Sequence, residues 1–420
     1  TMKKLLLILL CLPMIGFGQS WEQTFLGNTY NFYLGHSVQQ TIDGGYITVG
    51  EFKINYNQKV WLIKTDGNGQ EEWNRTFGNP NLCYTGKSVL QTIDGGYIAV
   101  ANVSYTFQKN MSANDSTFVM KTDNNGIEQW NTILTGISYV EEIQPTIDGG
   151  YVLVGTGATN VALKKIDLNG IEVWHQTLGG AGYDYGNSVQ QTTDGGYIIT
   201  GSTESFGNGD MDVYLIKTYA NGQEQWYRTF DDVGFSDEGY SVQQTTDGGY
   251  IITGRTGWNI WLIKTDGNGQ EIWNQTFDYS GYECGRSVQQ TTDGGYIIAG
   301  GTQSNPQGLV HLTKTDGNGQ EQWNRILQLY GAAYAVQQTT DGGYIVSGSS
   351  SGNTTGYNAL FLVKTDSQGN ITSTFNIPIN PNRKLQKTVD ILGKETKPKT
   401  NTPFIEIYDD GTVEKRIVIE

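Results

Sequence analysis

The sequence is poor in the residues that most often build metal and nucleophilic sites. Its 420 residues include three cysteines, three histidines and eight prolines. Cys11 lies in an N-terminal apolar run, whereas Cys83 and Cys284 belong to distant repeats, where we expect isolated thiols in loops. No HExxH, CxxC or phosphate-cradling Gly-Lys motif occurs. The sequence therefore predicts no catalytic residue, no metal ligand and no cofactor.

Charge is also scarce, and it is mostly of one sign. Charged residues make up 16% of the chain, which excludes a coiled coil, and the net charge of −15 argues against nucleic acid as a partner. Residues 1–18 carry +2 and residues 381–420 carry +1, which leaves −18 between them. In contrast, 56 glycines and 12% aromatic residues indicate a packed, turn-rich β protein.

A repeat dominates the chain. The string DGGY begins at seven aspartates, 46 to 54 residues apart: Asp43, Asp94, Asp148, Asp194, Asp247, Asp293 and Asp341. Each unit reads as four short strands, typified by SVQQT, YIITG, VYLIKT and QEIWNQTF, with the Asp-Gly-Gly turn joining the first two. The DGNGQE turn before the fourth strand begins like a calcium loop but lacks its later acid, so we expect a plain turn. Four-stranded units at this period predict the blades of a seven-bladed β-propeller.

The position of the tryptophans predicts how the ring closes. The fourth strand carries a tryptophan in seven places, and Trp21 precedes the first DGGY string, whereas no tryptophan follows the last one at Asp341. We therefore expect the strand from Trp21 to Phe25 to complete the blade that Asp341 begins. The third strand, as in Trp61, Leu62 and Ile63, is apolar on both faces, which is typical of a sheet between two neighbours.

The segment LIKTDGNGQEIW, from Leu262 to Trp273, resembles the tryptophan-docking repeat of pyrroloquinoline-quinone-type propellers. The likeness extends over most of the chain between Trp21 and Phe375. It implies that each tryptophan stacks against the adjacent blade. The enzymes of that family have eight-bladed rings with a calcium-bound quinone, and no residue here matches their cofactor site.

Candidate binding residues follow from the order of the strands. The DGGY and DGNG turns share one face, so the connections of varying length and composition gather on the opposite face, where propellers carry functional residues. Just before the Ser-Val-Gln-Gln position, the seven repeats place a ring of mixed residues around the expected mouth of the central channel: His36, Lys87, Glu141, Asn187, Tyr240, Arg286 and Tyr334. These side chains either orient a ligand or are solvated loop ends.

Three aromatic residues extend the candidate site over the variable face. Tyr183, Tyr185 and Trp258 lie in or beside its loops among small polar residues, a setting that suits sugar rings or a protein surface. The alternative is that they cover the ends of the blades. Paired acids occur in one loop, Asp231 with Asp232 and Asp237 with Glu238, and they are the candidates for catalysis, but acidic loops are usually only solvated.

The two ends of the chain predict export. From Met2, MKKLLLILLCLPMIGFGQS reads as a secretory signal peptide over residues 1–18, too short to span a membrane well. We expect a propeller over 19–375, a linker over 376–383 and a small β domain over 384–420. The latter resembles the sorting domains by which Bacteroidetes-type bacteria send proteins through the type IX secretion system, on the basis of DILGK at Asp390 to Lys394 and the Asp410–Gly411 turn.

Together these features predict an exported, secreted or cell-surface, non-catalytic propeller. Its expected partners are a polysaccharide or a surface protein at the variable face and the type IX machinery at the tail, with no nucleic acid and no transmembrane segment in the mature chain. Two alternatives stay open: an extracellular polysaccharide lyase, hydrolase or quinone-type oxidoreductase, and a purely structural surface component.

Overall fold

The computed structural model describes residues 20–25, 33–54, 57–105, 116–208, 210–232, 234–279, 281–302, 308–327, 329–351, 358–371, 385–390, 395–397, 404–408 and 413–416. The chain divides into two units, residues 1–372 and 373–420. The regular elements of the described residues are all β-strands, and no helix among them could cross a membrane. The expected signal peptide, residues 1–18, and linker, residues 376–383, lie outside this part of the chain.

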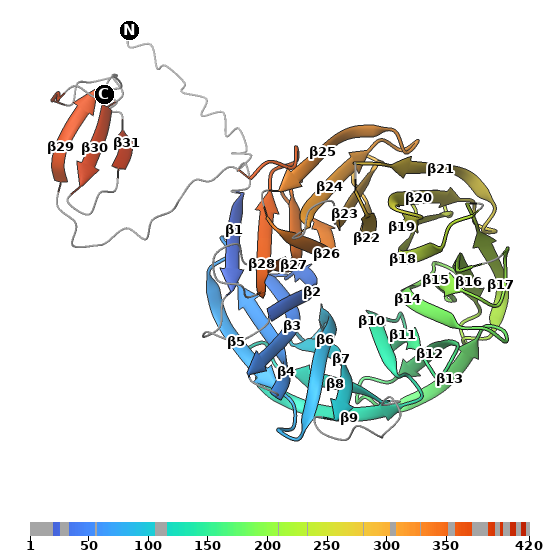
Figure 1. The fold of residues 1–420 in the computed structure, drawn as a ribbon. Helices are drawn as coiled ribbons and strands as arrows, with labels where there is room; N and C mark the ends of the chain where they lie inside the picture. The colour runs from blue at the N-terminus through green and yellow to red at the C-terminus, as the bar shows by residue number, and fades with distance from the viewer. Residues whose placement is uncertain are drawn as a thin grey trace, which may run out of the picture. The chain divides into compact units, whose positions relative to one another are not determined.

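The first unit is a ring of seven four-stranded antiparallel sheets, as the repeat predicts (Figure 1). Blades 1 to 7 begin at successive innermost strands: β2 (Tyr33–Gln40), β6 (Leu82–Gln91), β10 (Tyr139–Pro145), β14 (Asp184–Gln191), β18 (Asp237–Gln244), β22 (Glu283–Gln290) and β26 (Gly331–Gln338). The second strands are β3 (Tyr46–Ile54), β7 (Tyr97–Tyr105), β11 (Tyr151–Thr156), β15 (Tyr197–Thr203), β19 (Tyr250–Thr256), β23 (Tyr296–Thr302) and β27 (Tyr344–Ser351).

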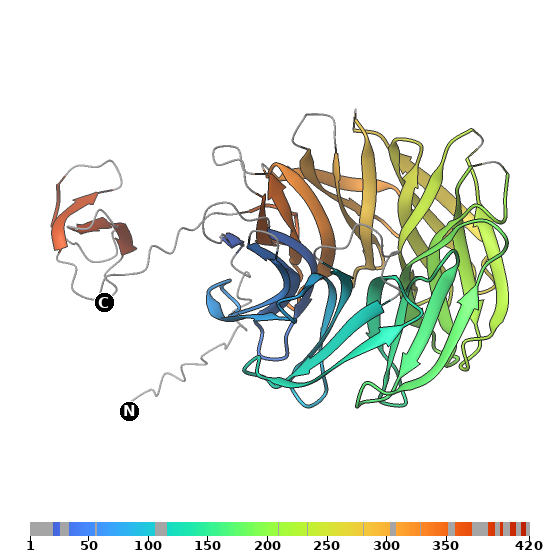
Figure 2. The ribbon, with the colours of Figure 1, turned by 60° about the horizontal axis from the view of Figure 1, so that its bottom comes forward.

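The third and outermost strands complete each blade. The third strands are β4 (Asn57–Thr65), β8 (Ser116–Thr122), β12 (Val161–Ile166), β16 (Asp212–Thr218), β20 (Asn259–Thr265), β24 (Leu309–Thr315) and β28 (Asn358–Thr365). The outermost strands are β5 (Glu71–Phe77), β9 (Glu128–Thr135), β13 (Glu172–Leu178), β17 (Glu224–Phe230), β21 (Glu271–Phe277), β25 (Glu321–Leu327) and, in blade 7, β1 (Trp21–Phe25). The strands run between the two faces of the ring, where the connections lie (Figure 2).

The ring closes through β1, as expected. This strand pairs antiparallel with β28, with Trp21 opposite Lys364 and Phe25 opposite Leu360. The same junction is joined at the channel, where the Gln40 N–H donates to Gln337 Oε1 at 2.7 Å. Equivalent bonds between successive inner strands occur at five of the seven blade junctions in the described residues, so the free edge of each of these inner strands is hydrogen-bonded by its neighbour.

Apolar residues pack between the blades rather than around one centre. Seven clusters of buried side chains occupy the seven junctions, and the one that joins blade 7 to blade 1 includes Leu362, Ile63 and Trp61. The third strands are buried on both faces, which confirms their expected position inside each sandwich. Burial of a large apolar side chain stabilises a fold by about 1.5–3 kcal/mol, so these junctions hold the ring together.

Each outer-strand tryptophan packs on the next blade. The indole of Trp226 lies over Gly269 in the DGNG turn of blade 5, so close that a Cβ on this glycine would be 2.6 Å from the ring. Trp21 does the same across the closure, over Gly69, and its indole N–H donates to the Gly67 carbonyl at 3.1 Å. In the turn itself, Asp266 Oδ1 accepts from the N–H groups of Asn268 and Gln270.

A buried ion pair stabilises the other turn of every blade, and the sequence did not suggest it. The lysine of each third strand reaches the aspartate of the DGGY turn, with N–O distances of 2.7 to 3.0 Å: Lys64–Asp43, Lys121–Asp94, Lys165–Asp148, Lys217–Asp194, Lys264–Asp247, Lys314–Asp293 and Lys364–Asp341. The second turn glycine allows this approach, since a Cβ on Gly249 would lie 2.1 Å from the Thr265 carbonyl and 2.5 Å from Lys264 Nζ. The lysines are almost fully buried, whereas most of the aspartates are half exposed.

The aspartate of this pair is held in its charged form. Partial burial raises the pKa of Asp247, but the hydrogen bonds from Thr245, Gly249 and Lys264 lower it by a larger amount, so the pKa is about 2. Because this pKa is below the ordinary value of 3.8, the pair contributes stability above that value, and the contribution is lost as the pH falls toward 2.

The second unit is a three-stranded antiparallel sheet of β29 (Leu385–Asp390), β30 (Phe404–Tyr408) and β31 (Val413–Arg416). The sequence predicts strands over Lys387–Leu392, Phe404–Tyr408 and Lys415–Ile419, so the middle strand has the expected bounds and the outer two begin two residues earlier. The Asp410–Gly411 turn lies outside the described residues.

We predict that removal of the aspartate from the ion pair destabilises the fold more than removal of the lysine does. Asp247→Asn keeps the turn acceptor but leaves the Lys264 ammonium, which is 3% exposed, without a carboxylate, so it should lower the free energy of unfolding at pH 7 by about 3 kcal/mol. Lys264→Met leaves only a half-exposed aspartate and should cost less. Urea unfolding of the two variants between pH 7 and pH 2 measures both effects, and the Asp247→Asn deficit should shrink toward pH 2. An equal or larger cost for Lys264→Met would contradict this account.

Candidate functional site

The seven expected channel residues occupy the same unusual position in seven inner strands. In every inner strand the pairing register with the second strand shifts across one residue, and these are His36, Lys87, Glu141, Asn187, Tyr240, Arg286 and Tyr334. A β-bulge leaves one residue out of the ladder and redirects its side chain. The residues therefore lie inside strands and are not loop ends, which corrects one of the two sequence interpretations. In the sequence, the available signal for these bulges was a variable residue between a repeated glycine and serine, as in Gly86-Lys87-Ser88.

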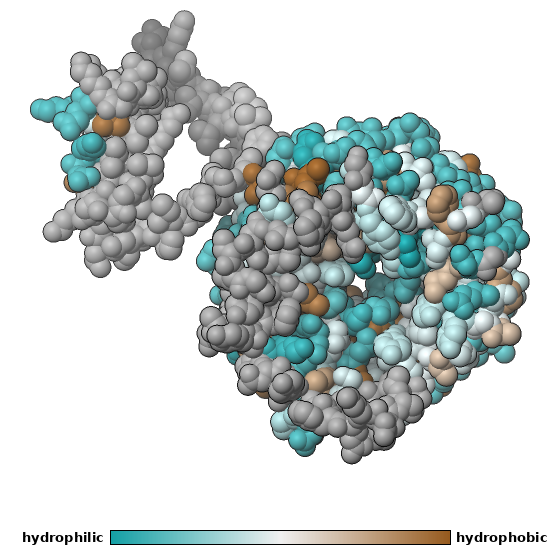
Figure 3. Space-filling view, viewed as in Figure 1, coloured by the Kyte–Doolittle hydropathy of each residue, from teal (hydrophilic) through white to brown (hydrophobic). Residues whose placement is uncertain are grey.

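The bulged residues surround one cavity at the variable end of the central channel. All seven line a space of about 350 Å³, together with the residues that follow them in the strands. Hydrophilic residues surround the hollow at the centre of the ring in Figure 3. The structure thus brings together side chains that are separated by up to 298 residues in sequence, from His36 to Tyr334.

Neighbouring members of this ring contact one another. Lys87 and Glu141 form an ion pair at 2.7 Å across blades 2 and 3. The Asn187 amide donates to the Gly239 carbonyl at 2.7 Å across blades 4 and 5. The Arg286 guanidinium lies between two tyrosine rings, 5.4 Å from the centre of Tyr240 and 5.0 Å from that of Tyr334. These contacts hold the bulged side chains in defined positions.

Two cationic side chains of the cavity, Lys87 and Arg286, act on the imidazole of His36. Burial lowers the pKa of His36 to about 3, and the charges of Lys87 and Arg286 lower it in the same direction, so this imidazole is neutral at physiological pH. Nε2 of His36 and Nε of Arg286 are buried without a hydrogen-bond partner in the described residues. In these residues Arg286 forms no ion pair or hydrogen bond, and it contacts the two tyrosine rings. Its guanidinium donors are therefore free for an acceptor that enters the cavity.

Deeper in the channel, the lining becomes repetitive. A second space of about 290 Å³ is lined by a layer of serines, Ser37, Ser88, Ser188, Ser241 and Ser287, and then by a layer of glutamines. Glu142 and Ala335 take the serine position in blades 3 and 7. Burial raises the pKa of Glu142, and its carboxylate accepts from the Val189 N–H at 2.9 Å. Variation between repeats is thus concentrated in the outer layer.

The loop aromatics form two groups on the variable face. Tyr183 and Tyr185 stack with ring centres 6.5 Å apart, and Tyr183 is half exposed. Trp258 is 68% exposed and lies 6.5 Å from the ring of Tyr282. Neither Tyr183 nor Trp258 lines the cavity, so the structure separates the candidate residues into a channel ring and an outer aromatic set.

A chain of contacts connects Trp258 with the channel. Its neighbour Tyr282 stacks with Arg255 at 5.2 Å, Arg255 is ion-paired with Glu238, and Glu238 accepts a hydrogen bond from the Tyr240 hydroxyl. Burial and the carboxylates of Glu204 and Glu238 raise the pKa of Tyr185, which extends the same group toward blade 4. A ligand bound at the outer aromatic residues would therefore contact side chains that are linked, through these interactions, to the residues of the cavity.

The positions and surroundings of the loop acids and the two cysteines differ from those expected from the sequence. Asp237 and Glu238 are adjacent in β18 but have separate surroundings, since Glu238 faces Arg255 whereas Asp237 is buried beside Asp212. Cys83 and Cys284, expected in loops, lie in β6 and β22. A strand that begins earlier than the SVQQ signal accounts for this difference.

Comparison with known proteins extends only to the fold. No protein-family model and no curated protein matches the sequence. Similar solved structures include a protein of unknown function from Dyadobacter fermentans (12% identity, TM-score 0.51, 82% of this chain and 97% of that chain). Others are Sqt1 from Chaetomium thermophilum bound to the N-terminus of the ribosomal protein L10 (12%, 0.51, 94% and 98%) and streptogramin B lyase (12%, 0.51, 83% and 99%). Such likenesses show a shared fold and leave function to be argued from the site.

We predict that His36 contributes to acid sensitivity. Because its pKa is about 3 in the folded protein and near 6.5 in the unfolded chain, the unfolded state takes up the proton first, and stability falls as the pH decreases from 6.5 toward 3. His36→Gln should remove this part of the pH dependence, measured as free energy of unfolding at several pH values. His175→Gln, at a half-exposed histidine on β13, is the control and should change the slope less. An NMR titration of the His36 ring with a midpoint near 6.5 would refute the assignment.

Proposed function

We propose that this protein is an extracellular, non-catalytic propeller that binds a polysaccharide at the variable end of its channel and receives a carboxylate of that polymer at Arg286. One observation carries the proposal: seven identical bulge positions hold seven side chains drawn from six residue types, whereas the layers beneath mostly repeat serine and glutamine. A purely structural ring would have no reason to vary at the one layer that faces an open cavity.

The donors, acceptors and charges of the cavity indicate which class of ligand fits it. The Arg286 guanidinium lies close to two tyrosine rings, and its planar fork of donors matches a carboxylate in a bidentate arrangement. Asn187, Tyr334 and neutral His36 supply donors and acceptors for hydroxyl groups. The net charge of the propeller disfavours a densely anionic polymer, so a polysaccharide with occasional uronic acids fits best.

The outer aromatics support a sugar polymer that extends beyond the cavity. Tyr183, Tyr185 and Trp258 offer rigid, partly apolar platforms next to polar loop residues. The cavity of about 350 Å³ falls in the range of sites that enclose a small group, here one sugar unit, with the chain continuing across the face. An acidic protein segment is the second candidate, because a propeller of similar fold, Sqt1, is seen bound to the N-terminus of a protein.

Binding is proposed in preference to catalysis because the two acids that line the cavity are already engaged. Glu141 is ion-paired with Lys87, and Glu142 accepts hydrogen bonds from the Val189 N–H and the Gln144 amide. A general acid or base requires a carboxyl group that is free to exchange a proton with the substrate.

We predict that loss of the channel guanidinium weakens binding. Arg286→Ala in the mature chain should reduce affinity for a uronate-containing glycan by tenfold or more, since a hydrogen bond to a charged group is worth about 1.5–3 kcal/mol. Trp258→Ala and Tyr185→Ala should weaken it less. Calorimetry with glycans selected on an array measures the effect, and Arg325→Ala on the outer strand β25 is the matched control.

Two results would count against this function. If no glycan on an array of neutral and uronate-containing polymers binds the mature chain, a polysaccharide ligand is excluded. If acidic peptides bind and Arg286→Ala abolishes that binding, the second candidate replaces the first.

We also propose that the chain is secreted or displayed on the cell surface, directed by residues 1–18 and 384–420. Support comes from the apolar N-terminal run with its two lysines and from the likeness of the tail to type IX sorting domains. In a bacterium with that secretion system, the full chain should be found outside the outer membrane. A chain that ends at residue 383 should accumulate in the periplasm, and equal export of both forms would contradict the assignment.

A further inference from the structure

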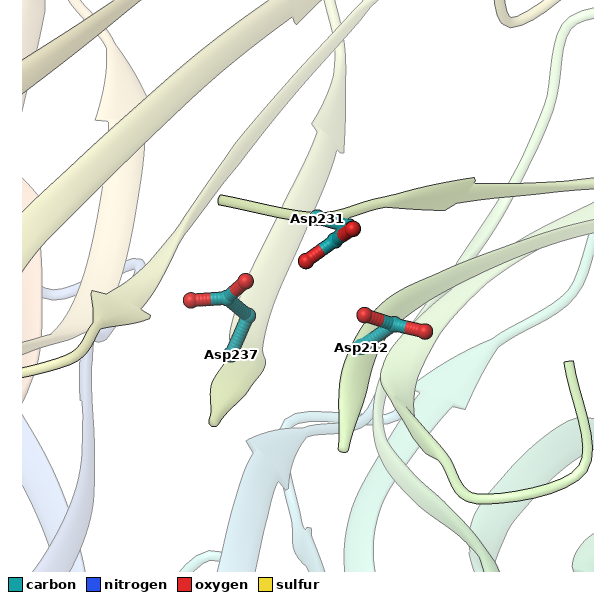
Figure 4. Close-up of side chains that lie close together, drawn as sticks. All are labelled: Asp212, Asp231 and Asp237. Carbon is teal, nitrogen blue, oxygen red and sulfur yellow. The ribbon is translucent and has the colours of Figure 1, made fainter. Parts of the chain in front are cut away.

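Three aspartates from separate segments meet on the variable face between blades 4 and 5. Asp212 begins β16, Asp231 follows the end of β17, and Asp237 begins β18. One carboxylate oxygen from each lies within 4.8 Å of the other two. Figure 4 shows that the three carboxylates point toward a common space. The segments are held together independently of these side chains, since the Asp237 N–H donates to the Met211 carbonyl at 2.7 Å.

Two of the three aspartates are buried, and no cationic side chain among the described residues pairs with any of them. Asp212 is 1% exposed and Asp237 is fully buried. One oxygen of Asp237 accepts from the Asp232 N–H at 2.7 Å, but the other, Oδ1, is buried with no hydrogen-bond partner in the part of the chain that is described. None of the ion pairs between described residues involves the three aspartates. Buried carboxylates are normally paired with a cation or bound to a metal ion.

The same position in blade 4 shows that the fold does not require such a cluster. Asp184 begins β14 as Asp237 begins β18, yet both of its oxygens are satisfied by neutral donors. Its carboxylate accepts from the hydroxyls of Thr203 and Ser205 and from the Gly180 N–H. In the next blade, Thr256 pairs with Asp237 as Thr203 pairs with Asp184, but its hydroxyl donates to Asp232 at 3.1 Å, and the carboxylates of Asp212 and Asp231 lie beside Asp237. These two acids have no counterpart around Asp184.

The three carboxylates repel one another, because one oxygen from each lies within 4.8 Å of the other two and two of the aspartates are buried. Three carboxylates so close together are unfavourable unless protons or a cation offset their charge.

We propose that Asp212, Asp231 and Asp237 form a Ca²⁺ site that fastens the connection between blades 4 and 5. Carboxylate oxygens are the ligands that Ca²⁺ takes, and this ion tolerates the irregular geometry of loop sites and completes its shell with water or backbone carbonyls. The bound ion joins the start of β16 to the segment that leads into β18. Because Glu238 follows Asp237 directly and contacts Tyr240 and Arg255, the ion also steadies one side of the channel mouth.

The test is a Ca²⁺ titration of the chelator-treated mature chain at pH 7.5, by calorimetry and by thermal unfolding. The expected result is one saturable site with a dissociation constant of about 10⁻⁴–10⁻³ M, the range of extracellular calcium modules, and a rise in the melting temperature as it fills. Asp231→Asn is the informative variant, because its only hydrogen bond among the described residues is at 3.5 Å to the Asn208 amide, so the fold should survive. It should weaken Ca²⁺ binding at least about tenfold and remove the thermal shift.

Asp184→Asn provides the matched control, since it changes the equivalent aspartate of blade 4 and should leave Ca²⁺ binding unchanged. The proposal is overturned if the unmodified chain shows neither heat nor thermal shift with Ca²⁺, which is the result expected of acids that are merely protonated. It is also overturned if Asp231→Asn binds as the parent does. Tighter binding of Mg²⁺ than of Ca²⁺ would reject the assignment to calcium.

Discussion

The antiparallel pairing of β1 with β28 is the contact on which the rest of the architecture depends. It joins the two ends of the propeller by five residue pairs, from Trp21–Lys364 to Phe25–Leu360, and it places Trp21 on blade 1 as the other outer-strand tryptophans are placed on their neighbours. With the ring closed, seven inner strands face one axis at fixed angles. Only then do side chains from seven distant repeats form a single cavity.

Two kinds of interaction stabilise the ring, one between blades and one within each blade. Between blades, apolar clusters, docked tryptophans and glutamine side chains make contacts that differ little from one junction to the next. Within blades, the buried lysine and its aspartate fix the DGGY turn. The docked tryptophans and the lysine–aspartate pairs lie at the DGNG and DGGY turns, opposite the variable face, so the loops and bulges of that face can change without loss of these contacts.

Much of the fold was readable from the sequence because it is repeated. Trp21 without a preceding DGGY string and Asp341 without a following tryptophan were enough to predict the closure, and the position before Ser-Val-Gln-Gln identified all seven cavity residues. The bulge that directs them inward was not foreseen, since backbone register depends on the partner strand. The lysine–aspartate pairs and the Asp212, Asp231 and Asp237 group were also missed. Their members come from separate strands, turns and loops, and only folding brings them together.

The bulges have a consequence for how such a protein changes over time. A residue outside the strand ladder contributes little to the pairing of its own sheet, so it can be exchanged with little effect on the frame. Each blade supplies one such place, from His36 in blade 1 to Tyr334 in blade 7. Duplicated repeats that were once alike could therefore diverge at one bulge position at a time. Recognition of a new molecule would then need only a few substitutions in an unchanged propeller.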